Sequence, residues 1–221
     1  MSLFELNKVC CTLGEGESQK EVLRGISGVI EPGQVVSIVG PSGAGKSTLL
    51  NVMSGLERIT SGEVLYGGQN IAALSEKQRA RLRLKEFGFV FQAFHLIPSL
   101  TVYDNIVLPV AMNRKAVDRE YYEELIDCLG ISGLENKKAL QISGGEMQRV
   151  AIARAMINKP SVLFADEPTG NLDSANGDRV FSLLIQCSKS FGQTLIYVTH
   201  DGEKAKLSDV CWHILDGVVS E

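Results

Sequence analysis

A glycine-rich octapeptide stands between a short apolar run and a helical stretch, an order that few folds can accommodate. Residues Gly40 to Ser47 read GPSGAGKS and match the pattern G-x-x-x-x-G-K-[ST]. The run Val35 to Val39 before them is apolar and mostly β-branched, which predicts a buried parallel strand. A helix is expected to begin near Lys46. Strand, loop and helix in this order form the first half of a βαβ unit and indicate an α/β protein.

The octapeptide has the composition of a phosphate-binding loop. Its glycines let backbone N–H groups converge on phosphate oxygens at a helix N-terminus, where the helix dipole favours negative charge. Lys46 is expected to reach the β and γ phosphates of a nucleotide, and Ser47 to hold Mg²⁺ through its hydroxyl. The residues expected to surround the nucleotide here are Gly40, Pro41, Ser42, Gly43, Ala44, Gly45, Lys46, Ser47 and Thr48.

A second candidate for chemistry is an apolar run that ends in two acidic residues. Val162 to Ala165 predicts a buried strand, and Asp166 and Glu167 follow it directly. At the end of such a strand Asp166 can position Mg²⁺, and Glu167 can polarise the attacking water as general base. Taken alone, an acidic pair after a strand is more often a solvated turn. Beside a phosphate loop, the catalytic interpretation is favoured.

Two further polar residues follow predicted strands. Gln92 ends the apolar run 87–91 and is expected to contact Mg²⁺ and water, and His200 follows the run 194–199 and is expected to bond the γ-phosphate. A lone histidine is more often a structural one, which is our interpretation of His95 and His213.

The most specific segment is Ile142 to Glu146, which reads ISGGE and precedes an apolar helix. Ser143 and Glu146 fit a capping box, which needs no ligand. A capping box leaves Gly144 and Gly145 unexplained, since each costs roughly 1 kcal/mol relative to alanine in a helix. Backbone N–H groups exposed at such a helix start favour an anion, so the segment predicts a second anion-binding loop.

From Leu3 to Val219 the order of these segments resembles that of the ABC ATPase family. The resemblance identifies a P-loop at 40–47, a Q-loop at Gln92, a signature loop at 142–146, the pair Asp166 and Glu167, a D-loop ending at Asp173, and a switch histidine at His200. It implies ATP and Mg²⁺ as cofactors and ATP hydrolysis as the activity. It also implies a head-to-tail homodimer formed with ATP, in which Ser143, Gly144, Gly145 and Asp173 act at the partner's nucleotide.

The stretches 89–98, 101–105 and 166–174 are most similar to the macrolide-export and lipoprotein-releasing subgroup, and the cell-division cassette with its FtsX-like membrane partner is similar there too. This implies an integral-membrane permease as partner and a place at the cytoplasmic face of the cell membrane. Leu13 stands where many members carry an aromatic ring under the adenine, so Leu13 is expected near the base without a stacked ring. Ile142 and Glu146 replace the commoner Leu and Gln.

The expected architecture is an α/β P-loop NTPase (RecA-like) core with a parallel sheet, an N-terminal antiparallel β region and an inserted helical subdomain. We expect a single ATPase domain over 1–221, with a core lobe at about 1–92 and 160–221 and a helical lobe at about 93–159. Ser75 and Gln78 predict a capping box that opens a basic helix through Lys85, whose arginines are expected on a solvated face.

Composition narrows the partners. A net charge of -4 gives no general attraction to nucleic acid or anionic lipid, so no nucleic-acid partner is expected. Five cysteines without a C-x-x-C pair predict neither a disulfide framework nor a zinc site, and they fit a reducing compartment. The N-terminus lacks the basic start and apolar run of a signal peptide, and no stretch approaches the length needed to span a bilayer.

Three other functions compete with a transport ATPase. A GTPase should show N-K-x-D, and the Asn-Lys pairs at Asn136 and Asn158 both lack its aspartate. A soluble ABC ATPase of DNA repair or translation usually carries paired cassettes or long coiled coils, and this chain has no sustained heptads. A cassette that transmits force to an FtsX-like membrane protein without moving a substrate stays open.

Overall fold

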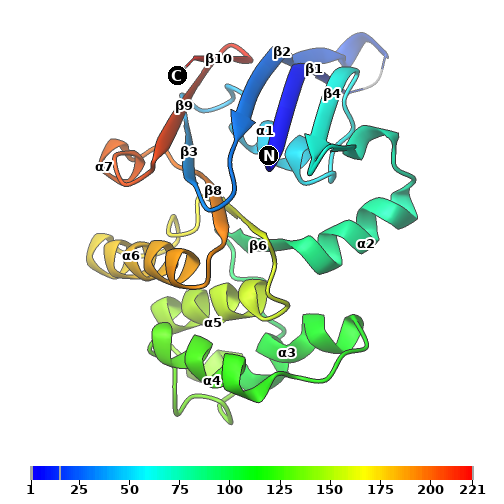
Figure 1. The fold of residues 1–221 in the computed structure, drawn as a ribbon. Coiled ribbons are helices and arrows are strands. Elements are labelled where there is room, and N and C mark those ends of the chain that lie inside the picture. Colours follow the sequence, from blue (N-terminus) through cyan, green and yellow to red (C-terminus); the bar gives the residue numbers. More distant parts are fainter. Residues whose placement is uncertain (1, 15, 221) are drawn as a thin grey trace. The chain divides into compact units, whose positions relative to one another are not determined.

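The computed structural model describes residues 2–14 and 16–220, without the side chain of residue 17. The chain divides into two compact units, Met1–Arg83 with Thr194–Glu221, and Leu84–Gln193 (Figure 1). The lobe boundaries expected from the sequence stay a prediction.

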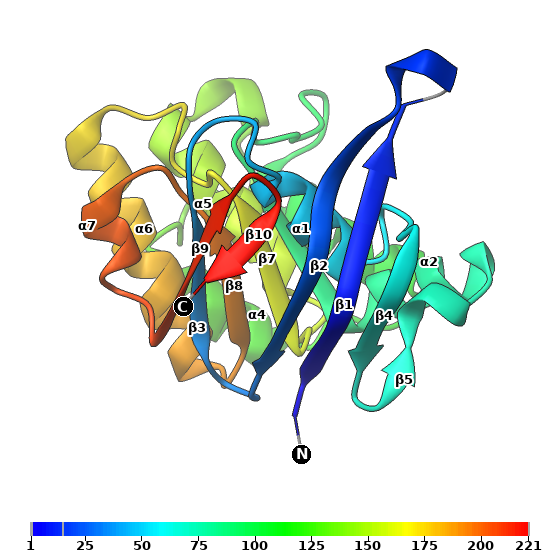
Figure 2. The ribbon, with the colours of Figure 1, turned by 90° about the horizontal axis from the view of Figure 1, so that it is seen from above.

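The first unit contains an antiparallel sheet in the order β2-β1-β4-β5. Its strands are β1 (Phe4–Leu13), β2 (Lys20–Ile30), β4 (Ser61–Tyr66) and β5 (Gln69–Asn70), and Figure 2 shows β1 between β2 and β4. Phe4, Leu6 and Val9 are buried, and the step of three rather than two residues reflects a bulge where Lys8 has φ 49°. This is the expected N-terminal antiparallel region.

The first unit also holds four strands in the order β10-β9-β3-β8. Strand β3 (Val35–Val39) runs parallel to β8 (Thr194–Val198) and β9 (Val210–Leu215), and β10 (Val218–Ser220) is antiparallel to β9. Strand β3 has neighbours on both edges, and four of its five residues are buried, as is typical of a strand inside a parallel sheet. The helical segments of the first unit are η1 (Gly16–Ser18), α1 (Lys46–Met53), η2 (Ile71–Ala73) and α7 (Gly202–Ala205), and α2 (Glu76–Glu86) contains the boundary between the units.

The second unit pairs β6 (Phe87–Phe91) with β7 (Val162–Asp166) in parallel and surrounds them with helices. These are α3 (Val102–Met112), α4 (Arg119–Cys128), η3 (Ala139–Gln141), α5 (Gly144–Met156) and α6 (Ser174–Ser190). Helix α5 contacts α3, α4, α6 and β6. It lies so close to β6 that a Cβ on Gly88 would stand 2.3 Å from the Ala155 carbonyl oxygen. The expected fold class is confirmed, including the helical insertion.

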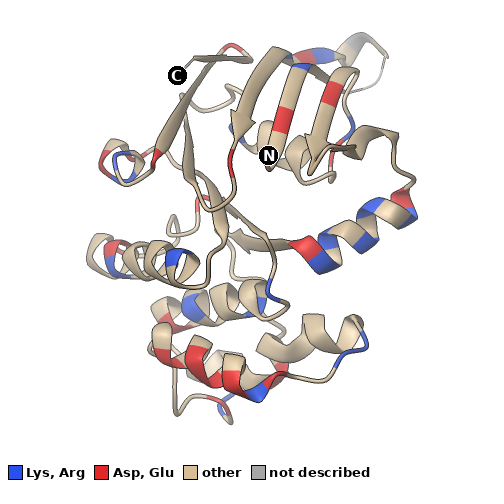
Figure 3. Cartoon of the chain, viewed as in Figure 1, with Lys and Arg blue, Asp and Glu red and all other residues tan. Residues whose placement is uncertain are grey.

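At the start of α2 the Ser75 N–H and hydroxyl both donate to Gln78 Oε1, at 2.9 and 2.6 Å, which is one of the two interactions of the expected capping box. The expectation of a solvated basic face was wrong for Arg79, which is 6% exposed and forms an ion pair with Glu76 at 2.7 Å. Arg83 joins the same carboxylate at 2.7 Å, and the two guanidinium groups lower the pKa of Glu76 to about 2. Figure 3 shows the mixed charges of α2.

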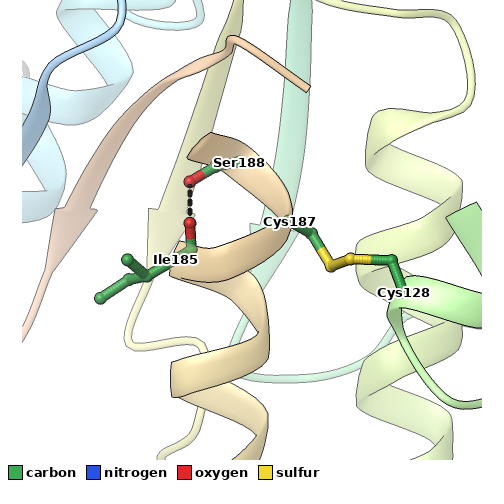
Figure 4. The surroundings of a disulfide bond; sticks show 4 residues. All are labelled: Cys128, Ile185, Cys187 and Ser188. Carbon is green, nitrogen blue, oxygen red and sulfur yellow. Dashed lines mark hydrogen bonds between the residues drawn. A yellow bond between two sulfur atoms is a disulfide. The ribbon is translucent and has the colours of Figure 1, made fainter. Parts of the chain in front are cut away.

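The expectation that the cysteines form no disulfide was also wrong. Cys128 at the end of α4 and Cys187 in α6 are bonded to each other, with their Cα atoms 6.3 Å apart (Figure 4). The two lie 59 residues apart, and only the packing of α4 on α6 brings them together, which a search for short cysteine spacings does not detect. Cys10, Cys11 and Cys211 are free.

Within the described ranges, none of the helices combines the length and the apolarity that crossing a bilayer requires.

Candidate functional site

Two glycines of the loop after β3 are required by the packing of the first unit. Gly40 has φ 153°, and a Cβ there would stand 2.1 Å from the Ile214 carbonyl oxygen. Gly45 has φ 107°, and its Cβ would lie 3.1 Å from the Val22 carbonyl oxygen. Only glycine combines these φ values with such close backbone neighbours. The loop therefore has its shape from strand packing on both sides.

The Lys46 side chain folds back into the glycine-rich loop that precedes it. Its side chain is 8% exposed, and its Nζ donates to the carbonyl oxygens of Gly40 and Pro41, at 2.9 Å in each case. The ammonium group therefore stands at the centre of the glycine-rich turn. A phosphate entering the loop would meet a cation whose position is already set.

The N-terminus of α1 is built without a side-chain cap. Gly45 is the N-cap residue and has no side chain with which to accept from the first N–H groups of the helix. Ser47 is exposed and Thr48 half-buried, whereas Ala44 is buried and its N–H donates to the Pro41 carbonyl at 3.3 Å. Pro41, Ser42 and Gly43 are exposed. An uncapped helix start under a glycine-rich turn suits an anion.

His200 lies in the same unit as the phosphate loop, past the end of the neighbouring strand. Strands β3 and β8 pair in register through Ile38 and Val198, and the Thr199 N–H donates to the Ile38 carbonyl at 3.2 Å. A cavity of about 480 Å³ is lined by Val39, Gly40, His200, Gly202, Ala205, Lys206, Cys211 and His213. His200 and the first loop glycine thus border one cavity. His213 is exposed, with its Nε2 3.5 Å from Cys211 Sγ.

In the second unit, Gln92 is joined to the D-loop by a reciprocal pair of hydrogen bonds. Its Nε2 donates to Asn171 Oδ1 at 3.1 Å, and Asn171 Nδ2 donates to the Gln92 carbonyl at 3.0 Å. Gly170 leaves room for this amide, since a Cβ at that position would stand 2.8 Å from Gln92 Nε2. Gln92 therefore has a defined position, and Asn171 was not predicted as the residue that supplies it.

Strand pairing places the acidic pair next to the end of β6. Phe91 is opposite Asp166 in the register, so Gln92 and Glu167 follow the ends of adjacent parallel strands. Asp166 and Glu167 are both half-buried. Glu167 has φ 45°, a left-handed conformation that costs a non-glycine residue about 1 kcal/mol or more and that gathers at functional sites.

Two residues of α5 that were not predicted as site residues hold the loops around this pair. Gln148 is 0% exposed, and its Nε2 donates to the carbonyl oxygens of Phe91, at 3.2 Å, and Pro168. Arg154 donates to the carbonyls of Phe94 and His95, at 2.8 and 2.6 Å. The sequence signal for Gln148 is a polar residue within an apolar helical segment.

The start of α5 is capped by its own side chains. Ser143 Oγ accepts from the Glu146 N–H at 3.3 Å, and the Ser143 N–H and hydroxyl each donate to Glu146 Oε2 at 2.7 Å. These bonds from Ser143 lower the pKa of Glu146. A Cβ on Gly144 or Gly145 would meet its neighbours at 3.4 Å or more, which is ordinary contact. The capping box is confirmed, and the packing of the described chain does not require either glycine.

Asp173 and Leu13 complete the predicted set. Asp173 is the N-cap residue of α6, and the side-chain and backbone N–H groups of Asn176 donate to its carboxylate and lower its pKa. Leu13 is the last residue of β1, opposite Lys20, and is half-exposed. Leu13, the phosphate loop and His200 belong to the first unit. Gln92, the signature loop, Asp166, Glu167 and Asp173 belong to the second.

A parallel sheet whose strand leads into a glycine-rich turn, an internal lysine and an uncapped helix defines a P-loop nucleotide-binding protein. The family described as ABC transporter matches residues 23–170. The chain is a member of the ABC transporter ATP-binding family.

Relatives of this family cover the chain end to end. The ABC transporter ATP-binding protein YbbA of Escherichia coli is 41% identical over 222 residues, which is 100% of this chain and 97% of that protein. The ABC transporter ATP-binding protein MJ1508 of Methanocaldococcus jannaschii is 42% identical, over 99% of this chain and 98% of that protein. MacB of Syntrophobacter fumaroxidans, a macrolide export ATP-binding/permease protein, is 42% identical over 99% of this chain and 31% of its own length.

Solved structures agree in fold. The dimeric ABC transporter cassette MJ0796 has a TM-score of 0.86 and 37% identity, and covers 99% of this chain and 97% of its own. A dimer of MJ0796 in a post-hydrolysis state with ADP and Pi gives a TM-score of 0.85. CbiO1 of Clostridium perfringens, part of the transporter complex cbiONQ, gives 0.88 at 30% identity. The family and the subgroup expected from the sequence are confirmed, and nucleotide binding follows from them.

Proposed function

We propose that this chain hydrolyses ATP with Mg²⁺ as one of two copies that join head to tail, and that it drives an integral-membrane permease from the cytoplasmic face of the membrane. The observation that carries the proposal is the contrast between the uncapped phosphate loop and the start of α5, where two glycines face no packing demand of the described chain. A backbone without side chains suits the close approach of a partner's phosphate.

The residues proposed for Mg²⁺ have the right chemistry for it. Ser47 supplies a hydroxyl oxygen, Gln92 an amide oxygen and Asp166 a carboxylate, the hard ligands that Mg²⁺ prefers together with phosphate and water. Among the described residues, no group of three His, Cys, Asp or Glu side chains could hold a metal by itself. Such a site fits a cation that arrives with a nucleotide. Bound there, Mg²⁺ would neutralise phosphate charge.

In the proposed mechanism Lys46 exchanges its two loop carbonyls for phosphate oxygens, and the α1 N–H groups cradle the phosphates. Glu167 accepts the proton of the attacking water, and Gln92, fixed by Asn171, orients that water. His200 bonds the γ-phosphate. In the second copy, Ser143, Gly144, Gly145 and Asp173 complete the site. Leu13 lies beside the adenine base and leaves most of the affinity to the phosphates.

Glu167→Gln tests the hydrolysis step. The amide keeps the shape of the carboxyl group but cannot take a proton, so steady-state turnover should be lost while ATP binding remains. With ATP and Mg²⁺ this variant should elute as a dimer on size exclusion. Glu123→Gln, the same change at an exposed position of α4, is the control and should turn over like the wild type. Wild-type turnover in Glu167→Gln protein would remove Glu167 from the role of base.

Mixing two inactive variants tests the head-to-tail arrangement. Ser143→Arg blocks the signature loop, and Lys46→Ala removes the cation of the phosphate loop. Each site combines the phosphate loop of one copy with the signature loop of the other, so each homodimer is damaged in both of its sites. In a mixed dimer, one composite site carries both lesions and the other carries none. Mixing should therefore restore activity to the heterodimers. Failure to restore any activity, when native mass spectrometry shows that heterodimers form, would contradict the arrangement.

The permease contact is proposed at the segment after Gln92. The expected apolar residues there are Phe94, Leu96, Ile97, Leu100 and Tyr103, of which Ile97 is 38% and Tyr103 39% exposed. Asn105, buried in α3, bonds both the N–H and the carbonyl of Ile97, at 2.7 and 3.1 Å, so the exposed side chain has a rigid base. Ile97→Glu should leave the melting temperature unchanged and abolish co-purification with the permease. A folded variant that still binds the permease would exclude Ile97 from the contact.

A further inference from the structure

We propose that Cys128 and Cys187 form a reversible thiol–disulfide modification site, and that oxidation of the pair slows the ATP turnover proposed above. The bond joins Cys128, the last residue of α4, to Cys187 in the last turn of α6 (Figure 4). The inference rests on the proposed function only for its effect on turnover. The site itself stands on the position of the two sulfur atoms.

The two cysteines differ in access, and the difference gives the order of reaction. Cys128 is half-buried, whereas Cys187 is 0% exposed. The Cys128 thiolate attacks a small organic disulfide RSSR, forms a mixed disulfide and releases RS⁻. The Cys187 thiolate then attacks the Cys128 sulfur and releases a second RS⁻, and the two RS⁻ take up the two cysteine protons. Two protein thiols and RSSR thus give one protein disulfide and two RSH. A small dithiol entering at Cys128 reverses the step.

Contacts other than the bond also hold α4 in place. Tyr121 of α4 packs edge-to-face on Phe191 at the end of α6, with ring centroids 5.0 Å apart. The Tyr121 hydroxyl also donates to the Met156 carbonyl at the end of α5, at 3.0 Å. Leu125 and Leu184 are fully buried. The Tyr121–Phe191 contact does not involve the bond, so we expect α4 to stay on α6 in the reduced chain and the bond to open and close without unfolding the unit.

The bond closes a ring of chain that contains the residues proposed for the reaction. Between Cys128 and Cys187 lie the signature loop from Ser143, the pair Asp166 and Glu167, and Asp173, which begins α6. Helix α5, which begins at the signature loop, contacts both tied helices. A covalent tie stabilises the arrangement of α4 and α6 described above relative to any other. A turnover cycle that moves these helices is slowed when they are tied.

The full chain, equilibrated with reduced and oxidised glutathione in varied ratio, provides the test. Intact mass spectrometry after alkylation reports the bond, and phosphate release with ATP and Mg²⁺ reports turnover. Oxidation should lower wild-type turnover by about fivefold or more, within the usual range of coupling between sites. A dithiol should restore it. Reduction should lower the melting temperature by about 10 °C, as expected for a ring of this length in a chain of this size.

Two variants separate this site from other thiols. Cys128→Ser should show no redox response, and Cys10→Ser, which removes a free and partly exposed thiol, should respond like the wild type. Equal turnover of the oxidised and reduced wild type, faster turnover on oxidation, or alkylation of both cysteines under oxidising conditions would overturn the inference.

If even the reduced wild type hydrolyses no ATP, the proposed function fails, and hydrogen exchange decides the modification site. Residues 144–156 and 173–187 should then exchange more slowly in the oxidised chain. Identical exchange in both states would overturn the site on its own.

Discussion

Glycines stand at the start of α1, where Gly45 is the N-cap residue, and at the start of α5, which begins at Gly144, and the two starts differ in what holds them. Before α1, Gly40 and Gly45 have positive φ, and added Cβ atoms would press on backbone oxygens of the same unit. At α5, Gly144 and Gly145 have room for a Cβ, and Ser143 caps the helix from within the chain. The first start is fixed by the chain's own packing. The glycines of the second are explained by a contact from outside the chain.

The largest effect on this comparison is expected from Gly40→Ala. The new Cβ would meet the Ile214 carbonyl at 2.1 Å in a conformation that disfavours side chains, so the free energy of unfolding should fall by about 3 kcal/mol or more. Gly43→Ala is the matched control, because Gly43 has φ 78° but no neighbour within 4 Å, and it should lose only about 1 kcal/mol. Denaturant titration measures both. Equal losses would mean that backbone strain, not strand contact, sets the loop.

Gln148→Leu tests how firmly α5 is anchored behind its capped start. The substitution removes the bonds to the Phe91 and Pro168 carbonyls in a buried position and should cost about 1–3 kcal/mol of unfolding free energy. Gln69→Leu, at an exposed position of β5, is the control and should change it by less than about 0.5 kcal/mol. A neutral effect of Gln148→Leu would show that these two bonds contribute nothing to the anchor.

Gly145→Ala separates the two starts most directly. Alanine fits the space and suits a helix, so the free energy of unfolding should stay equal or rise by up to about 1 kcal/mol. Turnover should nevertheless fall by about tenfold, because a methyl group would stand where a partner's phosphate is proposed to approach. Thermal melting and phosphate release on one preparation measure the two effects. Full activity in a stabilised variant would leave the glycine without the proposed role.

The sequence predicted the first start almost completely, because the phosphate loop is local. The strand, the glycines and the helix form one continuous segment from Val35 to Met53, and short-range rules describe such segments well. The capping box at Ser143 was predicted for the same reason. The α/β class followed from the order of apolar runs.

The features that the sequence did not predict all involve contacts between distant segments. The Cys128–Cys187 bond, the burial of Arg79 and the amide of Gln148 depend on which helix faces which neighbour, and periodicity does not report that. The reciprocal hydrogen bonds between Gln92 and Asn171 join residues 79 positions apart. Family resemblance named Gln92, but only the packing shows what holds it.

Leu13→Tyr tests the residue that is expected beside the adenine base, and it should change nucleotide affinity by less than the substitutions above change stability or turnover. Leu13 is half-exposed at the end of β1, so a ring can be placed there without filling the core. Stacking on a base is worth about 1–3 kcal/mol, so ATP affinity should rise several-fold while turnover at saturating ATP stays unchanged. Titration with ATP and GTP measures this. Unchanged affinities together with lost stability would mean that the Leu13 side chain packs inward.

The smallest effect on stability is expected from Glu146→Gln, which removes the charge from the capping box of α5 but keeps a side chain that can accept the same hydrogen bonds. Hydrogen bonds from Ser143 lower the pKa of Glu146 below its ordinary 4.5, so the charged form stabilises the fold above that pH. This contribution is lost as the pH falls through the lowered pKa. The variant should therefore be slightly less stable than the wild type at pH 7 and equal to it in strong acid. A difference in stability that persists in acid would mean that the shape of the Glu146 side chain matters and not its charge.

The position of Lys46 has a consequence for how the site responds to ionic strength. Its ammonium group is removed from bulk water and already bonded to two carbonyl oxygens of its own loop, so an arriving phosphate replaces protein dipoles rather than a hydration shell. Counter-ions screen charges on the surface far more than charges inside the protein. The attraction between loop and nucleotide is thus a short-range property of the folded chain, and salt concentrations that would weaken binding to exposed lysines leave it largely intact.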